Sequence, residues 1–501
     1  MRRTLVLLTG GLLAFSLALP AAVMAAPGHT VQVPGPKSGP HPDDTANIQQ
    51  ALDWCAHHGP NCTVQLQAGT YHTSQLVEYG FQGTFKGAGQ NRTTIAALKD
   101  LLVNWPDQEV VGCQPNLTDC RWPNFIIFVD GNIEVSDLAI DFPYTNGHET
   151  TPYAYYGTVT NQVWNAIDFL GDRSMGASVD RVSVTGREDN SSTNLGCGFN
   201  VMQGIVFDGW LPVPPYNQTY ATLSGSFAVR NSSVRTTCEG IVVSGMVKST
   251  QATIGGSPAT GNRIDDIGFA GIDLTGDNSV FDISYNHDFV DNVGPASDSH
   301  FGVLVEPGNI TGSSSRLSRF SIYDNNILVK DACGCSMTGI WLLDAVGGLP
   351  YWFTATVTHN TIALPATYLL PGEGKAGIDI NNIKGALISG NTITESATGT
   401  YEGIGVWGND PTWLPATGNA ITGNNVSGVA LDPTPGFAFA QIYLDGNTSK
   451  NLVMCLHHSD TVLDQGTSNK VIGCDPPAAT PKAAVGTGPV AHGLTAKPFL
   501  P

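Results

Sequence analysis

Carboxylate residues occur where an ordinary β-strand does not carry them. Asp273 and Asp379 each follow a Gly-Ile pair and precede an aliphatic residue, and Glu306 lies four residues after Gly302 in a related segment. Aspartate is depleted in strands, so its recurrence in an apolar strand motif suggests a functional role. Two carboxyl groups about 6.5–9.5 Å apart can hydrolyse a glycosidic bond, one as acid and one as the base that activates water. These residues therefore suggest glycoside hydrolysis, if the fold brings them together.

The elements that must position these residues are repeats of a short unit. An aliphatic-x-x-Asn-x-aliphatic segment recurs, and Asn262 to Asn286 spans 24 residues while Asn360 to Asn391 spans 31. A second segment has a small residue, an aliphatic residue, any residue and an apolar residue. β-Branched residues at alternate positions and a period of this size predict a solenoid of short strands, a parallel β-helix. The Asn is expected to adopt the left-handed conformation at a bend and to stack along the column.

The second segment sets the register. If its aliphatic and fourth residues point inward, the residue between them points outward, as do the residues two further on and two before the glycine. The middle outward row is then Asp168, Val206, Val242, Asp273, Leu304, Trp341, Asp379, Gly405 and Tyr443. The following row is Leu170, Asp208, Ser244, Thr275, Glu306, Leu343, Asn381, Trp407 and Asp445. The preceding row is Cys238, Phe269, His300, Met337, Lys375 and Tyr401.

This register places Asp273 and Glu306 on adjacent turns, with Cα atoms roughly 8 Å apart. We expect them to share the acid and base roles, with His300 on the Glu306 turn as a proton shuttle or tuning group. Asp379 lies about 14 Å from Asp273 and cannot pair with it. Each residue also has a structural interpretation: the aspartates as solvated surface groups, Glu306 as a strand end, and His300 as a surface histidine.

Aromatic residues accompany these carboxylates on the same predicted face. Trp341, Tyr401 and Trp407 could stack on sugar rings, while Asp379 and Lys375 would contact the substrate through hydroxyl or carboxylate groups. The alternatives are that the tryptophans pack under a loop and that Lys375 is solvated. Rings flanked by carboxylates indicate a carbohydrate cleft.

Composition limits the other classes. The chain has 501 residues, a formal net charge of −19 and 13% charged residues, which argues against a nucleic-acid partner. Residues 1–26 have the charged start, apolar run and small-residue exit of a signal peptide, so we expect a secreted or periplasmic protein without a membrane partner. Ten cysteines fit an oxidising compartment. Plausible pairs are Cys55/Cys62, Cys113/Cys120, Cys197/Cys238 and Cys455/Cys474, whereas Cys333 and Cys335 are too close for an easy bridge.

Three motifs near the N-terminus carry a family resemblance. Residues 43–52 read Asp-Asp-Thr-Ala-Asn-Ile-Gln-Gln-Ala-Leu, residues 66–71 Leu-Gln-Ala-Gly-Thr-Tyr, and residues 86–89 Lys-Gly-Ala-Gly. This opening resembles secreted proteins of the pectate-lyase-like superfamily. The resemblance implies an all-β, single-stranded right-handed parallel β-helix with an N-terminal helical cap and a substrate cleft on one strand face. We expect a cap with first strands over 27–100, the β-helix over 101–475 and a disordered tail over 476–501.

The resemblance leaves the activity open, because the superfamily hosts lyases, glycosidases and epimerases. Of the polygalacturonase motifs only Asp265-Asp266 is present, and Asp298-Ser-His300 departs from the Asp-Pro-His-Asp of alginate epimerases.

The preferred hypothesis is a monomeric glycoside hydrolase that needs no metal or other cofactor. Two alternatives remain: a lyase that acts on a uronic-acid polymer through Lys375 or His300, or a carbohydrate-binding adhesin without chemistry. For a lyase, Ca²⁺ could be held by oxygen ligands of the segment 277–306, namely Asp288, Asp291, Asn292 and Asp298; the alternative is that these residues form a polar loop between turns.

Overall fold

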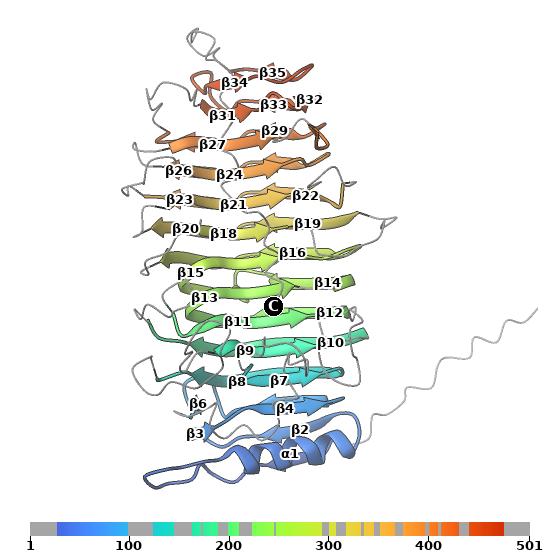
Figure 1. Ribbon diagram of the computed structural model, residues 1–501, viewed down its shortest axis with the longest axis vertical. Coiled ribbons are helices and arrows are strands. Elements are labelled where there is room, and N and C mark those ends of the chain that lie inside the picture. Colours follow the sequence, from blue (N-terminus) through green and yellow to red (C-terminus); the bar gives the residue numbers. More distant parts are fainter. Residues whose placement is uncertain are drawn as a thin grey trace, which may run out of the picture.

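The computed structural model describes residues 28–98, 124–144, 163–171, 174–188, 199–209, 223–244, 247–292, 300–306, 317–331, 335–344, 351–365, 374–395, 400–408, 412–429 and 440–474. Within these ranges the chain winds into stacked turns that form one long column (Figure 1). Strands at equivalent positions of successive turns pair in parallel, which divides the column into three parallel sheets.

The strands of the three sheets alternate along the chain, and the longest strands turn a corner and belong to two sheets. Sheet 1 contains β4 (Leu76–Tyr79), β7 (Ile126–Val129), β9 (Val163–Leu170), β11 (Val201–Asp208), the C-terminal halves of β13 (Ser233–Ser244) and β15 (Arg263–Leu274), β18 (His300–Val305), β21 (Met337–Leu343), β24 (Lys375–Asn381), β27 (Thr400–Trp407), β31 (Ala440–Leu444) and β34 (Val462–Asp464).

Sheet 2 contains β1 (Thr30–Gln32), β2 (Cys62–Gln65), β5 (Gln82–Lys86), the N-terminal halves of β8 (Asn132–Asp141) and β10 (Ser174–Thr185), β12 (Leu223–Arg230), β14 (Val247–Gly255), β16 (Val280–Ser284), β19 (Ser318–Tyr323), β22 (Phe353–Thr358), β25 (Leu387–Ser389), β29 (Ala420–Thr422), β33 (Leu452–Met454) and β35 (Lys470–Ile472). Sheet 3 contains β3 (Gly69–Thr73), β6 (Thr93–Ala97), the remaining halves of the four shared strands, β17 (His287–Asn292), β20 (Asn326–Asp331), β23 (Thr361–Leu364), β26 (Thr392–Glu395) and β30 (Asn425–Ser427). A minor pair joins β28 (Ala416–Thr417) to β32 (Thr448–Ser449).

The predicted register of sheet 1 is confirmed around its isoleucines. Ile272 pairs with Ile241 on one side and with Val303 on the other, and these side chains are fully buried or nearly so. Aliphatic and aromatic columns of this kind fill the interior along the whole described column. The parallel β-helix with an N-terminal helical cap is therefore confirmed.

A ladder of buried asparagines closes the bend between sheets 2 and 3. Each Nδ2 donates to the Oδ1 of the next asparagine at 2.9–3.0 Å, through Asn262, Asn286, Asn325, Asn360, Asn391 and Asn424. The predicted stacking is thus confirmed. The predicted left-handed conformation is wrong by one residue. Positive φ belongs to the residue before the Asn, as at Asp324 and His359, which leaves the asparagine free to turn its amide along the column.

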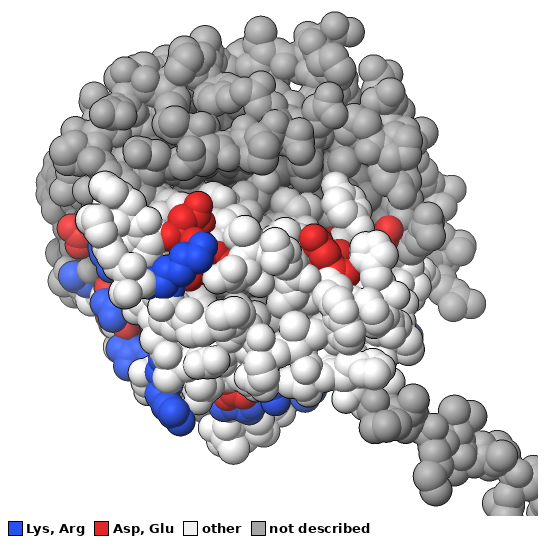
Figure 2. Space-filling view, turned by 90° about the horizontal axis from the view of Figure 1, so that it is seen from below, with Lys and Arg blue, Asp and Glu red and all other residues white. Residues whose placement is uncertain are grey.

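Helix α1 (Thr45–His57) covers the first turns, as the sequence predicts. Its buried residues are Ile48, Ala51, Leu52 and Cys55. The helix therefore covers the edge that the first strands would otherwise expose. The Asp43 carboxylate accepts a hydrogen bond from the backbone N–H of Thr45 at 2.9 Å. The view onto this end shows basic and acidic side chains together along one edge of the molecule (Figure 2).

Two of the predicted disulfides, Cys55–Cys62 and Cys455–Cys474, are present. Cys238 is also disulfide-bonded, but Cys113, Cys120, Cys197 and Cys333 lie outside the described residues, as do the predicted signal peptide and tail. In the described part of the chain, no helix is long and apolar enough to cross a membrane.

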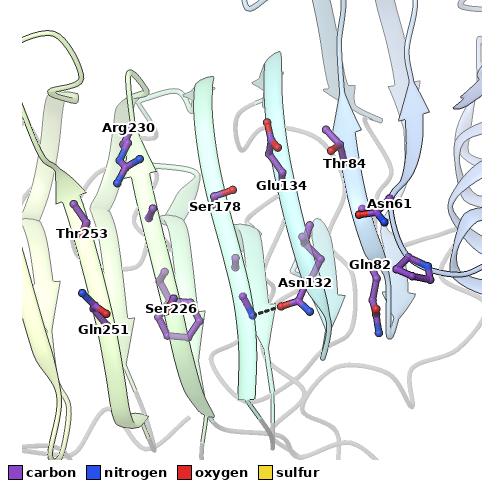
Figure 3. Close-up of a pocket in the computed structure, with 17 residues that line it drawn as sticks. Asn61, Gln82, Thr84, Asn132, Glu134, Ser178, Ser226, Arg230, Gln251 and Thr253 are labelled. Carbon is purple, nitrogen blue, oxygen red and sulfur yellow. Dashed lines mark hydrogen bonds between the residues drawn. The ribbon is translucent and has the colours of Figure 1, made fainter. Parts of the chain in front are cut away.

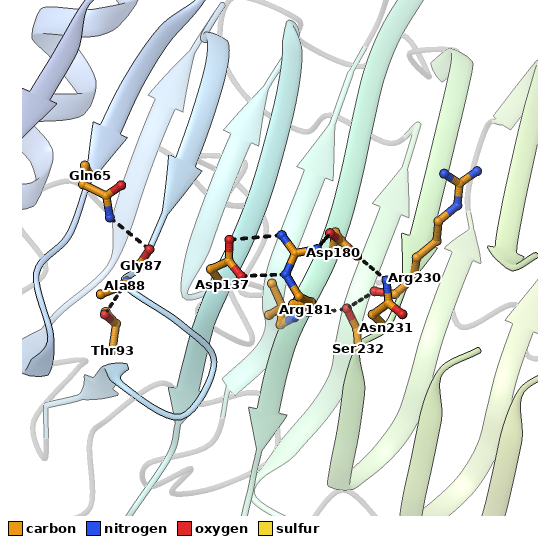
Figure 4. Close-up of polar contacts among 11 residues, drawn as sticks. Gln65, Gly87, Ala88, Thr93, Asp137, Asp180, Arg181, Arg230, Asn231 and Ser232 are labelled. Carbon is orange, nitrogen blue, oxygen red and sulfur yellow. Dashed lines mark hydrogen bonds and ion pairs between the residues drawn. The ribbon is translucent and has the colours of Figure 1, made fainter. Parts of the chain in front are cut away.

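Charged side chains hold the outside of the sheet 2–sheet 3 bend. The Arg181 guanidinium donates to the Asp137 carboxylate from Nε at 2.6 Å and also pairs with Asp180 (Figure 4). Asn231 donates to the other Asp180 oxygen at 2.7 Å. Exposed pairs of this kind contribute little stability individually; their role is to join neighbouring turns.

One carboxyl group interrupts an aliphatic core column. Asp288 pairs in register with Ile264 and Ile327, is 3% exposed, and neither of its carboxyl oxygens has a hydrogen-bond partner. Its carboxyl lies against Gly271, where an added Cβ would come within 2.1 Å of both oxygens. Burial raises the pKa of Asp288 well above its ordinary value, which favours its neutral form in the folded chain.

Replacing Asp288 by valine is expected to stabilise the protein, and increasingly so as the pH rises from about 4 towards 7. The pKa of Asp288 is raised in the folded state, so over this range the unfolded chain releases a proton that the folded chain retains. Wild-type stability therefore falls by up to about 1.4 kcal/mol per pH unit through this group. Thermal melts of both proteins across the pH range measure the effect. Asp265→Val, at a surface residue paired with Arg263, is the control. A stability difference independent of pH would contradict the prediction.

Candidate active site

On the N-terminal side of each sheet 1 glycine, the residues that face outward are not the ones that the sequence-based register predicts. A Cβ built on Gly302 would lie 2.3 Å from Cγ2 of the core residue Ile327, so the glycine and the residue after it both face inward. Two successive inward positions shift the alternation by one residue. The residue directly before the glycine therefore faces outward: Phe301 packs with Leu304 and Trp341 in a cluster separate from the main core.

Three carboxyl groups gather on this outward face, on consecutive strands of sheet 1. Glu239 directly precedes the β13 glycine, Asp273 lies near the end of β15, and Glu306 follows β18. Asp273 pairs with Leu304, so Glu306 lies one strand over and two residues on, with a Cα separation of about 8 Å. Gln203 Nε2 donates to Glu239 Oε2 at 2.7 Å. The enclosed Oδ1 of Asp273 has no hydrogen-bond partner.

Burial and mutual repulsion keep this set partly protonated. Burial raises the pKa of Asp273 well above its ordinary value, and the charges of Glu306 and Glu239 raise it further. Burial also raises the pKa of Glu239 to about 7, against the opposing hydrogen bond from Gln203, and it raises the pKa of Glu306. Interacting carboxyls lose their protons in steps that belong to the whole set. Burial therefore favours protonated carboxyls in this set of three interacting groups, an arrangement that can supply a proton donor beside a proton acceptor.

His300 is not beside Glu306, contrary to the sequence-based expectation. The two stand six residues apart at opposite ends of one extended strand, which separates their Cα atoms by about 20 Å. His300 is 1% exposed and pairs with Met337 in the register. This spacing does not favour a direct proton shuttle between His300 and Glu306, and a tuning role for His300 stays a prediction.

Lys375 is also misplaced by the sequence-based register. It stands two residues before Gly377, so the shifted alternation takes it off the outer face, and its side chain is fully buried. Its Nζ donates to the carbonyl of Pro365 at 2.9 Å. The expected contact between Lys375 and substrate in an open cleft is contradicted.

The predicted aromatic platforms lie in different settings. Trp341 is on the outer face but 8% exposed, because its ring stacks on Phe301 with centroids 4.9 Å apart. Trp407 is half-buried beside Tyr443, with centroids 4.6 Å apart. Tyr401 belongs to β27, but its side chain is outside the described residues.

A second carboxyl pair lies further along sheet 1. Asp379 Oδ1 accepts a hydrogen bond from Trp407 Nε1 at 3.1 Å, and Asp379 also hydrogen-bonds with the Glu402 carboxyl. Burial raises the pKa of Asp379 to about 6 against these two hydrogen bonds. Burial, then the charges of Asp379 and Glu395, raise the pKa of Glu402 well above its ordinary value. Both shifts favour the protonated form of the pair over two adjacent carboxylates.

Glu239 and Glu402 are absent from the sequence-based site because strict alternation points them inward. The signal that could have found them is a repeated tripeptide, since Glu-Gly-Ile occurs at 239–241 and again at 402–404. Asp168, in the predicted middle row, is fully buried. It accepts hydrogen bonds from the side-chain amides of Asn124 and Asn165, and burial raises its pKa to about 7.

Sheet 2 carries a hollow of about 730 Å³ over β5, β8, β10, β12 and β14. The short side chain of Ser178 lies between the longer amide side chains of Gln82 and Gln251 (Figure 3). Among the lining residues the charged ones are a single acid, Glu134, and a single base, Arg230. The lining residues of the hollow offer polar contacts but no pair of carboxyl groups.

The expected Ca²⁺ ligands do not form a site in the described part of the chain. Asp288 points into the core, and Asp298 and the side chains of Asp291 and Asn292 lie outside the described residues. No group of three or more His, Cys, Asp or Glu side chains among the described residues is arranged to hold a metal ion.

No protein-family model and no curated protein matches the sequence. Among solved structures, the chain is similar to the A-module of an Azotobacter vinelandii mannuronan C-5 epimerase, with 13% identity, a TM-score of 0.41, and coverage of 88% of this chain and 96% of the other. DFA-IIIase of Arthrobacter chlorophenolicus in complex with DFA-III has 13% identity to this chain and a TM-score of 0.47, and the match covers 90% of this chain and 100% of the other. The catalytic unit of a Streptomyces thermodiastaticus α-1,3-glucanase has 13% identity to this chain and a TM-score of 0.47, and the match covers 93% of this chain and 68% of the other. All three are carbohydrate-active enzymes, of different classes.

Proposed function

We propose that this protein is a secreted glycoside hydrolase that binds a glycan along the outer face of sheet 1. The observation that supports this function is the gathering of Glu239, Asp273 and Glu306 on three consecutive strands, with a partnerless, enclosed oxygen on Asp273. A Cα offset of about 8 Å allows a carboxyl separation in the range that leaves room for water, which is the arrangement of inverting hydrolysis.

In this mechanism Asp273 is the acid, because both neighbouring carboxylates favour its protonated form. It donates its proton to the glycosidic oxygen as the bond from that oxygen to the anomeric carbon breaks. Glu306 is the base: it takes a proton from water as the water oxygen bonds to the anomeric carbon. Glu239 acts through its charge, which keeps Asp273 protonated. The products are two sugar chains, one with a new reducing end.

The test is product analysis on a panel of soluble polysaccharides. Hydrolysis gives new reducing ends and products heavier by one water, whereas elimination by a lyase gives unsaturated products that absorb in the ultraviolet. We expect reducing ends without ultraviolet absorption from the wild type and neither from Asp273→Asn. Unsaturated products, or retention of a glycan without any cleavage, would replace the proposal with the lyase or the adhesin.

Glu239→Gln is expected to move the basic limb of the kcat–pH profile to lower pH. The Glu239 charge raises the pKa of Asp273, so its removal lets the acid lose its proton earlier, and the rate falls sooner as pH rises. Rates on the accepted polysaccharide across the pH range measure the shift. Asp265→Asn, at the other end of strand β15 on sheet 3, is the control and should leave the profile unchanged. If the basic limb of the kcat–pH profile stays in place or moves to higher pH, the Glu239 charge does not keep Asp273 protonated.

A further inference from the structure

The charged residues at the described outward positions of sheet 1 are all acidic. The described residues at its outward positions, directly before the glycine and two and four residues after it, include no lysine or arginine. The acids among them are Asp168, Asp208, Glu239, Asp273, Glu306, Asp379, Glu402 and Asp445. An anionic polymer laid along these strands would be repelled by the ionised members of this set, and the described outward positions provide no base to compensate that repulsion.

The second carboxyl pair forms a compact cluster whose shape depends on one missing side chain. Asp379, Glu402 and Trp407 converge over Gly405: a Cβ built there would lie 2.2 Å from Asp379 Oδ1, 2.4 Å from Trp407 Nε1 and 3.0 Å from Glu402 Oε1. Three polar atoms from two strands thus share the space above one glycine. Any larger residue at position 405 would push them apart.

A buried acceptor without a partner lies beside this cluster. Asn381, two residues after Asp379 and opposite Trp407 in the register, is 6% exposed, and its Oδ1 has no hydrogen-bond partner. A buried amide oxygen costs free energy unless a donor reaches it. A sugar hydroxyl is such a donor, and the half-buried Trp407 supplies an apolar ring face for the sugar beside it.

The carboxyl pair itself suits binding better than catalysis. Asp379 Oδ1 and Glu402 Oε1 lie 2.2 and 3.0 Å from the same point above Gly405, so the two carboxyl groups are closer together than the roughly 6.5–9.5 Å that leaves room for the water of inverting hydrolysis. A neutral acid beside a carboxylate is instead both donor and acceptor, the combination that neighbouring hydroxyl groups match. The net negative charge of the pair disfavours a uronate in the same position.

We infer that Asp379, Asn381, Glu402 and Trp407 form a subsite for an uncharged sugar unit, and that the substrate is therefore a neutral glycan and not a polyuronate. This inference rests on the proposed hydrolase function, because that proposal lays the glycan along the outer face of sheet 1. The subsite lies three strands from Asp273, about 14 Å along the column, so it holds a sugar unit remote from the bond that breaks.

Affinity electrophoresis of the Asp273→Asn protein tests the inference without turnover. The probes are dextran, inulin, laminarin and galactomannan as neutral polymers, and polygalacturonate and alginate as polyuronates. We expect retardation by at least one neutral polymer and by neither polyuronate, with Trp407→Ala in the same background weakening it by about tenfold. Trp407→Phe keeps the ring and should recover much of the affinity, while Trp54→Ala, at a tryptophan of α1 that is 39% exposed, should change nothing.

Three outcomes would overturn the inference: retardation by a polyuronate at least as strong as by any neutral polymer, no retardation by any neutral polymer, or an unchanged affinity in a folded Trp407→Ala protein. The hydrolase proposal fails separately. If the wild type binds a neutral glycan through Trp407 but releases no reducing ends, the subsite stands without the catalysis. If it hydrolyses a glycan with an unchanged KM in Trp407→Ala, the catalysis stands without the subsite.

Discussion

Asp273→Asn is expected to lower kcat by about 10²–10⁴-fold, the contribution of a well-placed general acid or base. Asparagine keeps the shape of the side chain but has no acidic proton to give to the leaving oxygen. Because Asp273 Oδ1 makes no hydrogen bond to the protein, the substitution breaks no structural contact of that atom. KM is expected to change little, since the loss falls on the transition state. Initial rates on the accepted polysaccharide, with thermal melts to confirm folding, measure the effect.

The Glu306→Gln variant completes this experiment. We expect a comparable loss of kcat, and a double variant that is hardly slower than either single one, because the acid and the base act in the same step. Asp265→Asn changes an aspartate of the same β15 strand that faces away on sheet 3 and pairs with Arg263, so it should retain full activity. If both single variants turn over substrate at the wild-type rate, these carboxyls are not the catalytic pair.

Asn360→Ala is expected to destabilise the protein by about 3–5 kcal/mol, the largest stability effect that we predict. Asn360 Oδ1 accepts hydrogen bonds from the backbone N–H and the Nδ2 of Asn325 at 3.0 and 2.9 Å. Asn360 Nδ2 donates to Ile322 O at 2.9 Å and to Asn391 Oδ1 at 3.0 Å. Alanine removes all four, each worth about 0.5–1.5 kcal/mol. It also leaves the buried backbone N–H of Asn325 without a partner, at a cost of about 1–3 kcal/mol, whereas Asn325 Nδ2 still donates to the carbonyls of Ile283 and Tyr323.

Chemical denaturation and amide hydrogen exchange measure this loss of stability. Exchange should become faster first in the turns next to Asn360, because each turn of a stacked array contacts only its neighbouring turns. The matched control is Asn326→Ala, at an exposed asparagine beside the ladder, which should cost little. Equal stability of the two variants would mean that the ladder does not hold the turns together.

The sequence alone determined the architecture. Its repeats, the Gly-Ile motifs and the Asn positions predicted a parallel β-helix with a helical cap, because each turn repeats the same core pattern and can bury it only by stacking on the next. For the same reason the adjacency of Asp273 and Glu306 followed from their places in the motif. The disulfides Cys55–Cys62 and Cys455–Cys474 followed from short spacing at the two ends.

Tertiary structure alone decided which side chains face the glycan. The rung glycine faces inward together with the residue after it, a break that strict alternation cannot foresee, since it depends on the neighbouring turn: the Gly302 position is crowded by Ile327 and by the carbonyl of Gly339. This single-residue shift buried Lys375 and brought Glu239 and Glu402 to the outer face. Burial then set their protonation, because the pKa of a carboxyl depends on the water and charge around it, which no linear pattern records.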